Sequence, residues 1–163
     1  MPTRAEPRNW YDKYAFTIKI DGVVRAAFQK CSELTANIEA IEYREGGSLI
    51  PEQSAGLVSF EDLTLERGES ADEDLYNWFL KHYDPATGKG SAKTQDYQRT
   101  MTIEQRDRNG NVVRAWLVTR AFQKQYSAGD WDNDANEHKI ERVVLGHHGF
   151  EMVTGTAAAS PAV

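Results

Sequence analysis

The side chains best suited to chemistry lie in an acidic stretch in the last third of the chain. Oxygen-bearing side chains alternate there and end on a glutamate at the twelfth position, through Asp130, Asp132, Asp134, Asn136 and Glu141. This spacing matches most of the calcium-binding loop of an EF-hand. Ala135 stands where that loop needs a glycine, and the flanking segments have the pattern of strands rather than helices. The pattern therefore favours a solvated acidic turn, with a calcium site as the alternative.

Three further motifs resemble reactive or ligand-binding sites, and each lacks a necessary part. His147 and His148 are adjacent, so on a strand their side chains point to opposite faces and do not easily bind one metal together. The pair Gly88-Lys89 lacks the earlier glycine and the preceding strand of a phosphate-binding loop. Cys31 is the only cysteine, which excludes an intrachain disulfide and favours a small apolar strand residue. We therefore expect no enzymatic activity and no cofactor.

The composition indicates one domain with a substantial core. The chain has 163 residues, with 19 Lys plus Arg against 25 Asp plus Glu, which gives a formal net charge of −6. An acidic surface repels phosphate, so it argues against a dedicated nucleic-acid binder but is compatible with nucleic acid sliding past. Residues 1–8 hold no apolar signal segment, and no apolar run is long enough to span a bilayer. We expect the protein to fold in a cytoplasm.

Most of the chain has the period-two pattern of β-strands. Phe16, Ile18 and Ile20 alternate with polar residues, and Asp21-Gly22 fits a tight turn before a returning strand over 23–28. The apolar positions between Leu34 and Tyr43 change parity, which predicts a bulge near Ala40-Ile41. Further strands are predicted over 60–65, 101–106, 112–119 and 140–145, the last of them continuing toward Phe150 and Met152.

One helix is predicted after the acidic segment 70–74. Ser70 and Glu73 match a capping box, and an apolar stripe follows at helical spacing, formed by Leu75, Trp78, Phe79 and His82. The helix should end before Asp84-Pro85. Many strands and one helix indicate a mainly β (α+β) fold, an antiparallel β-barrel or sandwich with one amphipathic helix on one side or end of a curled sheet.

The domain organisation follows from the composition at the two ends. Residues 1–12 contain two prolines and mixed charges, and we interpret them as a flexible arm. Residues 13–153 form a single β domain, and 154–163 form a loose tail with little to bury. Two long polar loops, 46–56 and 85–98, are expected to order against a neighbouring molecule.

The order of several segments resembles one protein family, the tube proteins of phage tails and of contractile injection systems. The segments that carry the resemblance are 16–22 (FTIKIDG), 28–34 (FQKCSEL), 41–47 (IEYREGG), 63–68 (LTLERG), 75–78 (LYNW), 107–110 (DRNG) with Trp116, and 140–149 (IERVVLGHHG). No single segment is decisive, but their order and spacing are specific. The resemblance covers residues 14 to about 152.

The resemblance implies a structural role without an active site. Tube proteins have an antiparallel β-barrel or sandwich with one helix, and six copies form a ring whose sheets join around a lumen. Rings stack into a tube that is assembled on a baseplate, often inside a contractile sheath, closed by a terminator, and conducts DNA or protein cargo. The implied location is a virion tail or injection-system particle, after synthesis in a bacterial cytoplasm.

Assembly by joining sheets requires strands with unpaired edges, which predicts where the interfaces lie. We expect free edges on the strands around 38–45 and 100–106, and contacts between stacked rings from 1–12 and 46–56. Acidic strand residues, such as Glu39, Glu61 or Glu104, could face a wet lumen. The candidate interface residues are Ile38, Ile41, Tyr43, Arg44, Glu45, Gly46, Gly47, Pro51, Gly56, Arg67, Thr100, Ile103 and Trp116.

Two other functions remain open at this point. A secreted ring protein of a type VI apparatus shares the fold but not this order of motifs. A small β-barrel that binds a ligand or calcium would instead be a monomer or dimer with an enclosed pocket. Within the tube family, a phage tail and a bacterial injection device fit equally well, with or without a sheath.

Overall fold

The fold is a pair of antiparallel β layers with one short helix, as the sequence predicts. The computed structural model describes residues 10, 12, 13, 15–23, 27–91 and 93–153. The predicted arm lies outside this part except for Trp10 and Asp12, and the predicted tail lies wholly outside it. The elements are β1 (Phe16–Ile20), β2 (Lys30–Cys31), β3 (Ala36–Tyr43), β4 (Glu52–Phe60), β5 (Leu63–Gly68), α1 (Asp74–Leu80), the 3-10 turn η1 (Thr94–Asp96), β6 (Arg99–Arg106), β7 (Val112–Ser127), β8 (Ile140–Gly146) and β9 (Phe150–Val153).

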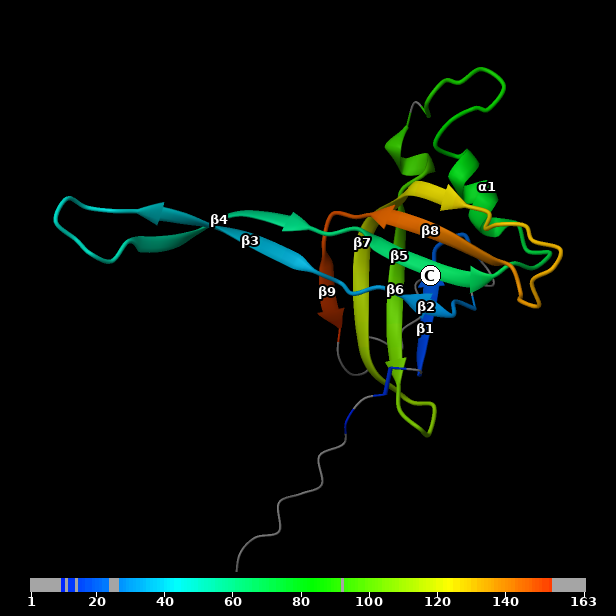
Figure 1. The fold of residues 1–163 in the computed structure, drawn as a ribbon, viewed down its shortest axis with the longest axis horizontal. Helices are drawn as coiled ribbons and strands as arrows, with labels where there is room; N and C mark the ends of the chain where they lie inside the picture. The colour runs from blue at the N-terminus through cyan, green and yellow to red at the C-terminus, as the bar shows by residue number, and fades with distance from the viewer. Residues whose placement is uncertain (1–9, 11, 14, 24–26, 92, 154–163) are drawn as a thin grey trace, which may run out of the picture.

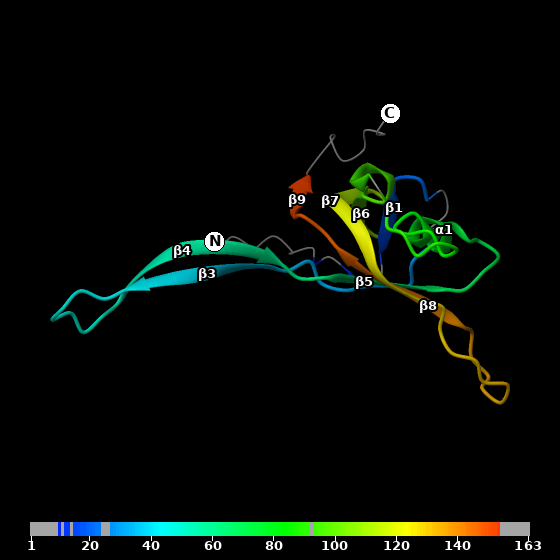
Figure 2. The ribbon, with the colours of Figure 1, turned by 90° about the horizontal axis from the view of Figure 1, so that it is seen from above.

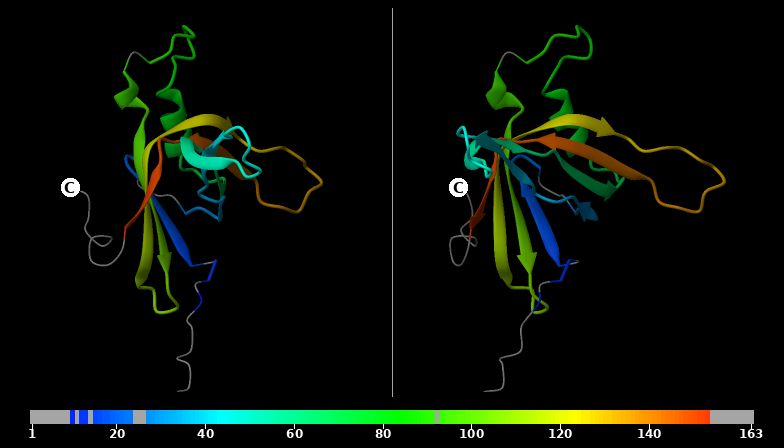
Figure 3. Two further views of the ribbon diagram at one scale, coloured as in Figure 1. Left: turned by 90° about the vertical axis from the view of Figure 1, so that its left-hand side faces the viewer. Right: turned by 60° about the vertical axis from the view of Figure 1, so that its left-hand side comes forward.

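The long strand β7 belongs to both layers and joins them. Its first half pairs with β6 as far as Ala121 and with β9 as far as Val118, and β6 pairs with β1. Its second half, from Phe122, pairs with β8, which continues through β5 to β2. Between the halves, Arg120 has a φ of 50°, and a register shift follows after Gln123. The strand therefore bends from one layer into the other, and the two layers cross steeply (Figures 1 and 3).

The core fills the space between the two layers and beneath α1. Ile18, Met101 and Val118 contribute from the first layer, and Leu65 and Val143 from the second, and all are buried. The helix adds Leu75 and Trp78, whose indole N–H donates to the carbonyl of Tyr97 at 2.6 Å. The helix thus covers the end of the layers where β7 passes into the second sheet (Figure 1).

The hairpin of β3 and β4 forms a separate two-stranded sheet that projects far from the body (Figures 1 and 2). The register shifts between Ile38 and Ala40, so the predicted bulge is confirmed. Gly56 lies opposite this bulge, where a Cβ atom would stand 2.9 Å from the carbonyl oxygen of Glu39 and 2.9 Å from Cγ1 of Ile41. Only glycine fits this position without displacing the partner strand.

The predicted start of the helix is wrong, and the returning strand predicted over 23–28 falls partly on residues 24–26, which lie outside the described residues. Val23 forms an isolated bridge with Ile20, and β1 pairs with β6. The helix begins at Asp74 rather than after a Ser70 cap. The N-cap position is Glu73, which makes no side-chain capping hydrogen bond, and the Asp72 carboxylate accepts the N–H of Asp74 at 3.0 Å in the turn that leads into the helix.

Strand boundaries also differ from the prediction in three places. The predicted strand over 60–65 is the junction of two strands, β4 and β5, with a break at Glu61 and Asp62. β7 continues eight residues past the predicted end at Thr119, to Ser127. β8 does not continue into β9, because the chain turns at Gly149 with a φ of 128° and β9 pairs with β7.

Candidate assembly surfaces

An apolar stripe runs along one face of the β3–β4 hairpin. Ile38 lies directly opposite Val58, and the side chain of Ile41 covers Gly56, which is two residues from Val58 and therefore on the same face. Phe60 continues the face to the base of the hairpin. All the β3 and β4 residues except Gly56 are exposed. An apolar face without a core beneath it is typical of a surface that a partner covers.

The tip of the hairpin exposes two aliphatic side chains. Leu49 and Ile50 are 94% and 78% exposed, and they are among the most exposed large apolar residues described. The tip is nevertheless ordered by its own hydrogen bonds, since Ser48 N–H donates to the Glu45 carbonyl at 3.1 Å and the Ser48 hydroxyl donates to the Ile50 carbonyl at 2.8 Å. The candidate residues predicted from the sequence that lie at this end are Tyr43, Arg44, Glu45, Gly46, Gly47 and Pro51.

An apolar groove opens at the base of the same hairpin, with a volume of about 440 Å³. Its apolar lining comes from β1, β2, the segment before β3, β6, β7 and β9, through Phe16, Cys31, Leu34, Ile103, Trp116 and Phe150. Trp116 and Phe150 meet edge to face, with ring centroids 5.8 Å apart. Burial raises the pKa of the Cys31 thiol to about 11, so this residue is an uncharged part of the wall. Two predicted interface residues, Ile103 and Trp116, thus meet in one groove.

The free edges of the first layer are β1 and β9. β1 is paired only with β6, and β9 only with β7, within the part of the chain that is described. The prediction that the strand of Thr100 and Ile103 is an edge is wrong, since β6 is paired on both sides. The free edge predicted for the strand of Ile38 is present among the described residues, where β3 pairs only with β4.

Glu104 does not lie on an open polar face. Its carboxylate is buried in the first layer and is bridged by Lys19 at 3.1 Å and by Arg106 at 3.0 Å. The hydroxyl of Thr17 also donates to it at 3.3 Å. Glu39 and Glu61 are exposed at the hairpin and at its base, so of the three acidic residues proposed for a lumen only Glu104 is enclosed by the fold.

Arg67 and Glu141 lie opposite each other on β5 and β8 and form a buried ion pair. Arg67 is therefore enclosed in the fold and does not contribute to an exposed interface.

The predicted calcium site loses its last residue to this ion pair, because Glu141 is buried beside Arg67 and not exposed with the acidic loop. The four other residues of the predicted calcium site are exposed, and Asp132 accepts the N–H of Asp134 at 3.0 Å in a local turn. No cluster of three metal-ligating side chains forms among the residues described.

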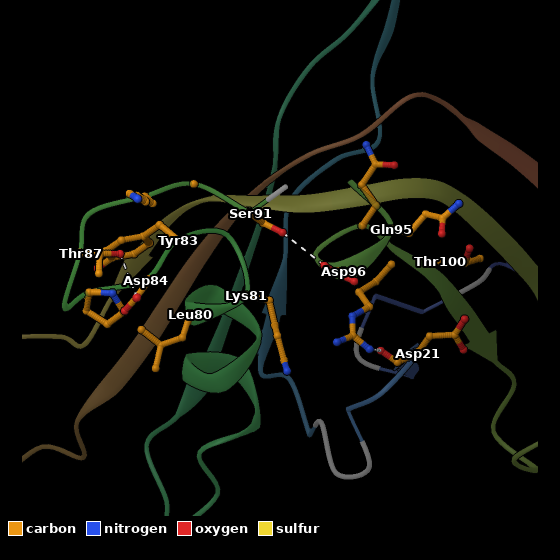
Figure 4. A pocket seen from close by; sticks show the side chains of 15 residues that line it. Asp21, Leu80, Lys81, Tyr83, Asp84, Thr87, Ser91, Gln95, Asp96 and Thr100 are labelled. Carbon is orange, nitrogen blue, oxygen red and sulfur yellow. Dashed lines mark hydrogen bonds between the residues drawn. The ribbon is translucent and has the colours of Figure 1, made fainter. Parts of the chain in front are cut away.

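A polar hollow of about 1190 Å³ lies between α1, the loop after it and the turn after β1 (Figure 4). Its cationic lining residues, Lys81, Lys89 and Arg99, face three carboxylates from Asp21, Asp84 and Asp96. The carboxylate of Asp84 is used within the loop, since the Ala86 N–H and then the Thr87 hydroxyl donate to it and lower its pKa. Thr100, predicted at an interface, lies at the rim of this hollow.

The two histidines of the predicted sequence motif serve the local backbone. Nε2 of His147 lies 3.0 Å from the carbonyl oxygen of Glu61, and Nδ1 of the same ring accepts a hydrogen bond from the N–H of Gly149 at 3.2 Å. The N–H of His148 donates to the Thr119 carbonyl at 3.1 Å. The last two contacts fix the turn between β8 and β9, and the contact with Glu61 connects this turn to the base of the hairpin. In addition, no helix in the described structure is long and apolar enough to cross a membrane.

Comparison with known sequences gives one family. The family model described as "T4-like virus tail tube protein gp19" matches residues 12–151. A search of curated proteins finds no match for this chain.

Solved structures share the fold at low sequence identity. The chain resembles one in the anti-feeding prophage baseplate, with a TM-score of 0.73 and 21% identity over 91% of this chain and 98% of that one. It resembles one in the sheath–tube complex of the extracellular contractile injection system PVC, with a TM-score of 0.74 and 19% identity over 89% and 92%. Similarity to a crystal structure of an Hcp protein is weaker, with a TM-score of 0.51 and 10% identity over 87% and 94%.

Proposed function

Because the chain belongs to the family of T4-like virus tail tube proteins, we propose that it is a structural subunit of the inner tube of a phage tail or of a contractile injection system. In this proposal residues 13–153 are one tube domain, six copies close into a ring, and rings stack around a lumen that conducts DNA or protein cargo. The chain acts by assembling and carries out no catalysis.

The observation that carries the proposal is the projecting hairpin with its exposed apolar stripe. Two strands without a packed face are marginally stable in water. Here β3 and β4 hold Ile38, Ile41 and Val58 in solvent, which a monomer does not need for its own core. A repeated neighbour would cover this stripe in an assembled tube. The exposed residues Tyr43, Arg44, Glu45, Gly46 and Gly47, and the half-buried Pro51 and Gly56, then belong to or support the same interface.

The two free edges of the first layer support closure into a ring. β1 and β9 lie at opposite ends of the strand order β1-β6-β7-β9. Joining β9 of one copy to β1 of the next would satisfy the backbone groups of both edges and repeat around an axis. A closed ring of copies is the arrangement that leaves no edge open.

The surrounding partners follow from the same role. The related chains of the anti-feeding prophage and of PVC come from a baseplate and from a sheath–tube complex. We propose sheath, baseplate and terminator proteins as partners of this chain, and a virion tail or an injection-system particle as its location. The weaker match to an Hcp protein makes a type VI ring protein the less favoured assignment.

Negative-stain electron microscopy of the purified full chain, with light scattering over a wide concentration range, tests the proposal. We expect rings with an open centre and stacked tubes, with a mass that corresponds to a hexamer for a single ring. A chain that stays monomeric at every concentration, with the amides of β3 and β4 already protected from hydrogen exchange, would contradict it, because its hairpin would then need no neighbour.

Two adjacent hairpin residues give a matched pair of variants. Val58, 54% exposed, belongs to the apolar stripe, and Leu57, 77% exposed, points to the opposite face. We expect V58D to prevent tube formation and L57D to preserve it, with the same free energy of unfolding for both monomers. Equal effects of the two variants on assembly would mean that the stripe is not the interface.

A further inference from the structure

We propose that the hairpin tip of one copy, carrying Leu49 and Ile50, inserts into the apolar groove at the hairpin base of a neighbouring copy. This inference rests on the proposed tube function and names the contact through which one subunit engages the next. The groove is the one lined by Phe16, Cys31, Leu34, Ile103, Trp116 and Phe150.

The tip cannot reach the groove of its own chain. The groove lies at the base of the hairpin, since Leu34 stands two residues before β3 and Phe150 contacts Phe60 at the end of β4, with ring centroids 6.0 Å apart. β3 has eight residues and β4 has nine, so at about 3.3 Å per residue the tip is about 25–30 Å away. The hairpin projects away from the body over this length (Figure 2). Any occupant that carries this tip must therefore be a second copy.

The shapes and chemistry of the two surfaces match. The tip is a narrow, convex end with two aliphatic side chains, and the groove is a concave opening with aromatic and aliphatic walls. The charged side chains that line the groove are Asp12, Lys13 and Glu33, and Asp12 is already bridged by Arg108 at 3.4 Å. The exposed Lys13 and Glu33 can therefore meet the exposed Glu45 and Arg44 of the tip. An aliphatic anchor in an apolar pocket with a polar rim is the usual arrangement of a protein interface.

The contact has a definite consequence for symmetry. The tip and the groove are different surfaces of one molecule, so each copy engages one neighbour with its tip and receives another in its groove. Such a heterologous contact either closes into a ring or repeats along an open stack, whereas a two-fold dimer needs one surface that pairs with itself. The inferred contact is thus of the kind that a tube requires.

The single native cysteine provides a direct test. Cys31 lies in the groove wall, and it is the only thiol of the chain. In assembled I50C, mild oxidation should join the introduced thiol to Cys31 of the neighbour, because insertion brings their Cα atoms within the roughly 4.4–6.8 Å that a disulfide needs. We expect a ladder of covalent oligomers on a non-reducing gel that collapses to monomer on reduction.

Two controls isolate the contact. I50C/C31S lacks the groove thiol and should give at most dimers through pairs of tips. N109C places the new thiol in the exposed turn between β6 and β7, away from the hairpin, and should give no ladder. Tubes of I50C that form normally but yield no ladder would overturn the tip–groove contact and leave the tube function standing.

A second variant tests the contact without a cross-link. We expect I50D to raise the concentration needed for assembly at least tenfold and L57D to change it less than threefold. If I50D assembles like the native chain, the tip is not seated in an apolar groove and the inference fails. If neither the native chain nor any variant forms rings or tubes, the proposed function fails together with it.

Discussion

Arg67 Nε lies 2.5 Å from the carboxylate of Glu141, and both side chains are almost fully buried, with Arg67 3% and Glu141 4% exposed. The two residues are direct cross-strand partners on β5 and β8. The Tyr126 hydroxyl donates to the other carboxylate oxygen at 3.1 Å, and Arg67 Nη2 donates to the Asp72 carbonyl at 3.0 Å. One network therefore connects three strands of the second layer with the residues that precede α1.

Removing one member of this buried pair should be costly. In R67A the buried carboxylate of Glu141 loses its cationic partner, and we expect the free energy of unfolding to fall by about 3–5 kcal/mol. Urea denaturation of the monomer measures it. The control is R142A, which breaks the exposed Arg142–Glu66 pair and should cost less than about 1 kcal/mol. Similar losses of unfolding free energy in R67A and R142A would show that the buried pair stabilises the fold no more than the exposed pair.

The same network predicts a dependence on alkaline pH. Burial, and then the negative charge of Glu141, raise the pKa of Tyr126 from 10.0 to about 12. The fold favours the protonated phenol, so this contribution to stability is complete below pH 10 and is lost as the pH rises through about 12. We expect the free energy of unfolding to fall more steeply in the native chain than in Y126F between these values. Parallel curves for the two proteins would contradict this.

The groove thiol should react slowly. Burial raises the pKa of Cys31 from 9.0 to about 11, so at pH 8 the fraction of thiolate is about a hundredfold smaller than for an ordinary cysteine. The rate of reaction of the monomer with a thiol-specific disulfide reagent at pH 8 should be lower by about this factor than in urea. The rate should then rise about tenfold per pH unit up to pH 10. A rate equal to that of the unfolded chain would mean that the wall of the groove is open.

Gly56 should be needed for assembly rather than for the fold of the body. In G56V the new side chain meets the Glu39 carbonyl and the Ile41 side chain, which distorts the bulge and the apolar stripe. We expect loss of tubes in electron micrographs, with the thermal midpoint of the monomer changed by only a few degrees. G46A, at a position where a Cβ meets no atom within 4 Å, is the control and should assemble normally.

The edges of the first layer should become protected on assembly. Amides of β1 that face away from β6, and amides of β9 that face away from β7, have no strand partner within the described chain. We expect these amides to exchange quickly in the monomer and slowly in the tube, as measured by hydrogen exchange with mass spectrometry. The central strand β6 is the internal control, since its amides should be protected in both states. Unchanged exchange at β1 and β9 would exclude joining of the sheets.

Sequence patterns predicted the features that depend on neighbours along the chain. The change of parity before Tyr43 indicated the bulge because side chains alternate along a strand, whichever strand lies beside it. The helical spacing of Leu75 and Trp78 identified the buried face of α1. The fold class followed from these local patterns, and the order of the segments indicated the family.

Pairings between distant strands could not be predicted in the same way. The short turn at Asp21-Gly22 favoured a local hairpin, but β1 pairs with β6, about 85 residues further along, through contacts between Ile18 and Ile103. The sequence suggests an interface role for Arg67 and places Glu141 in a solvated acidic turn, with calcium binding as the alternative. A charged residue in a strand pattern does not reveal its partner, so their ion pair could not be predicted. The groove was also beyond prediction, since its walls come from six separate segments.

The junction between hairpin and body makes the hairpin a lever. At this junction the Glu61 N–H donates to the Thr35 carbonyl at 3.1 Å, and the Asn37 amide donates to the Glu61 carboxylate at 2.9 Å. Over a length of about 28 Å, a tilt of about 10° at the junction moves the tip by about 5 Å, which is roughly the spacing of neighbouring strands. A small change of angle at the junction therefore shifts the tip by about the distance between two neighbouring strands. In the tube proposed above, such arms would share bending and torsion among many pivots.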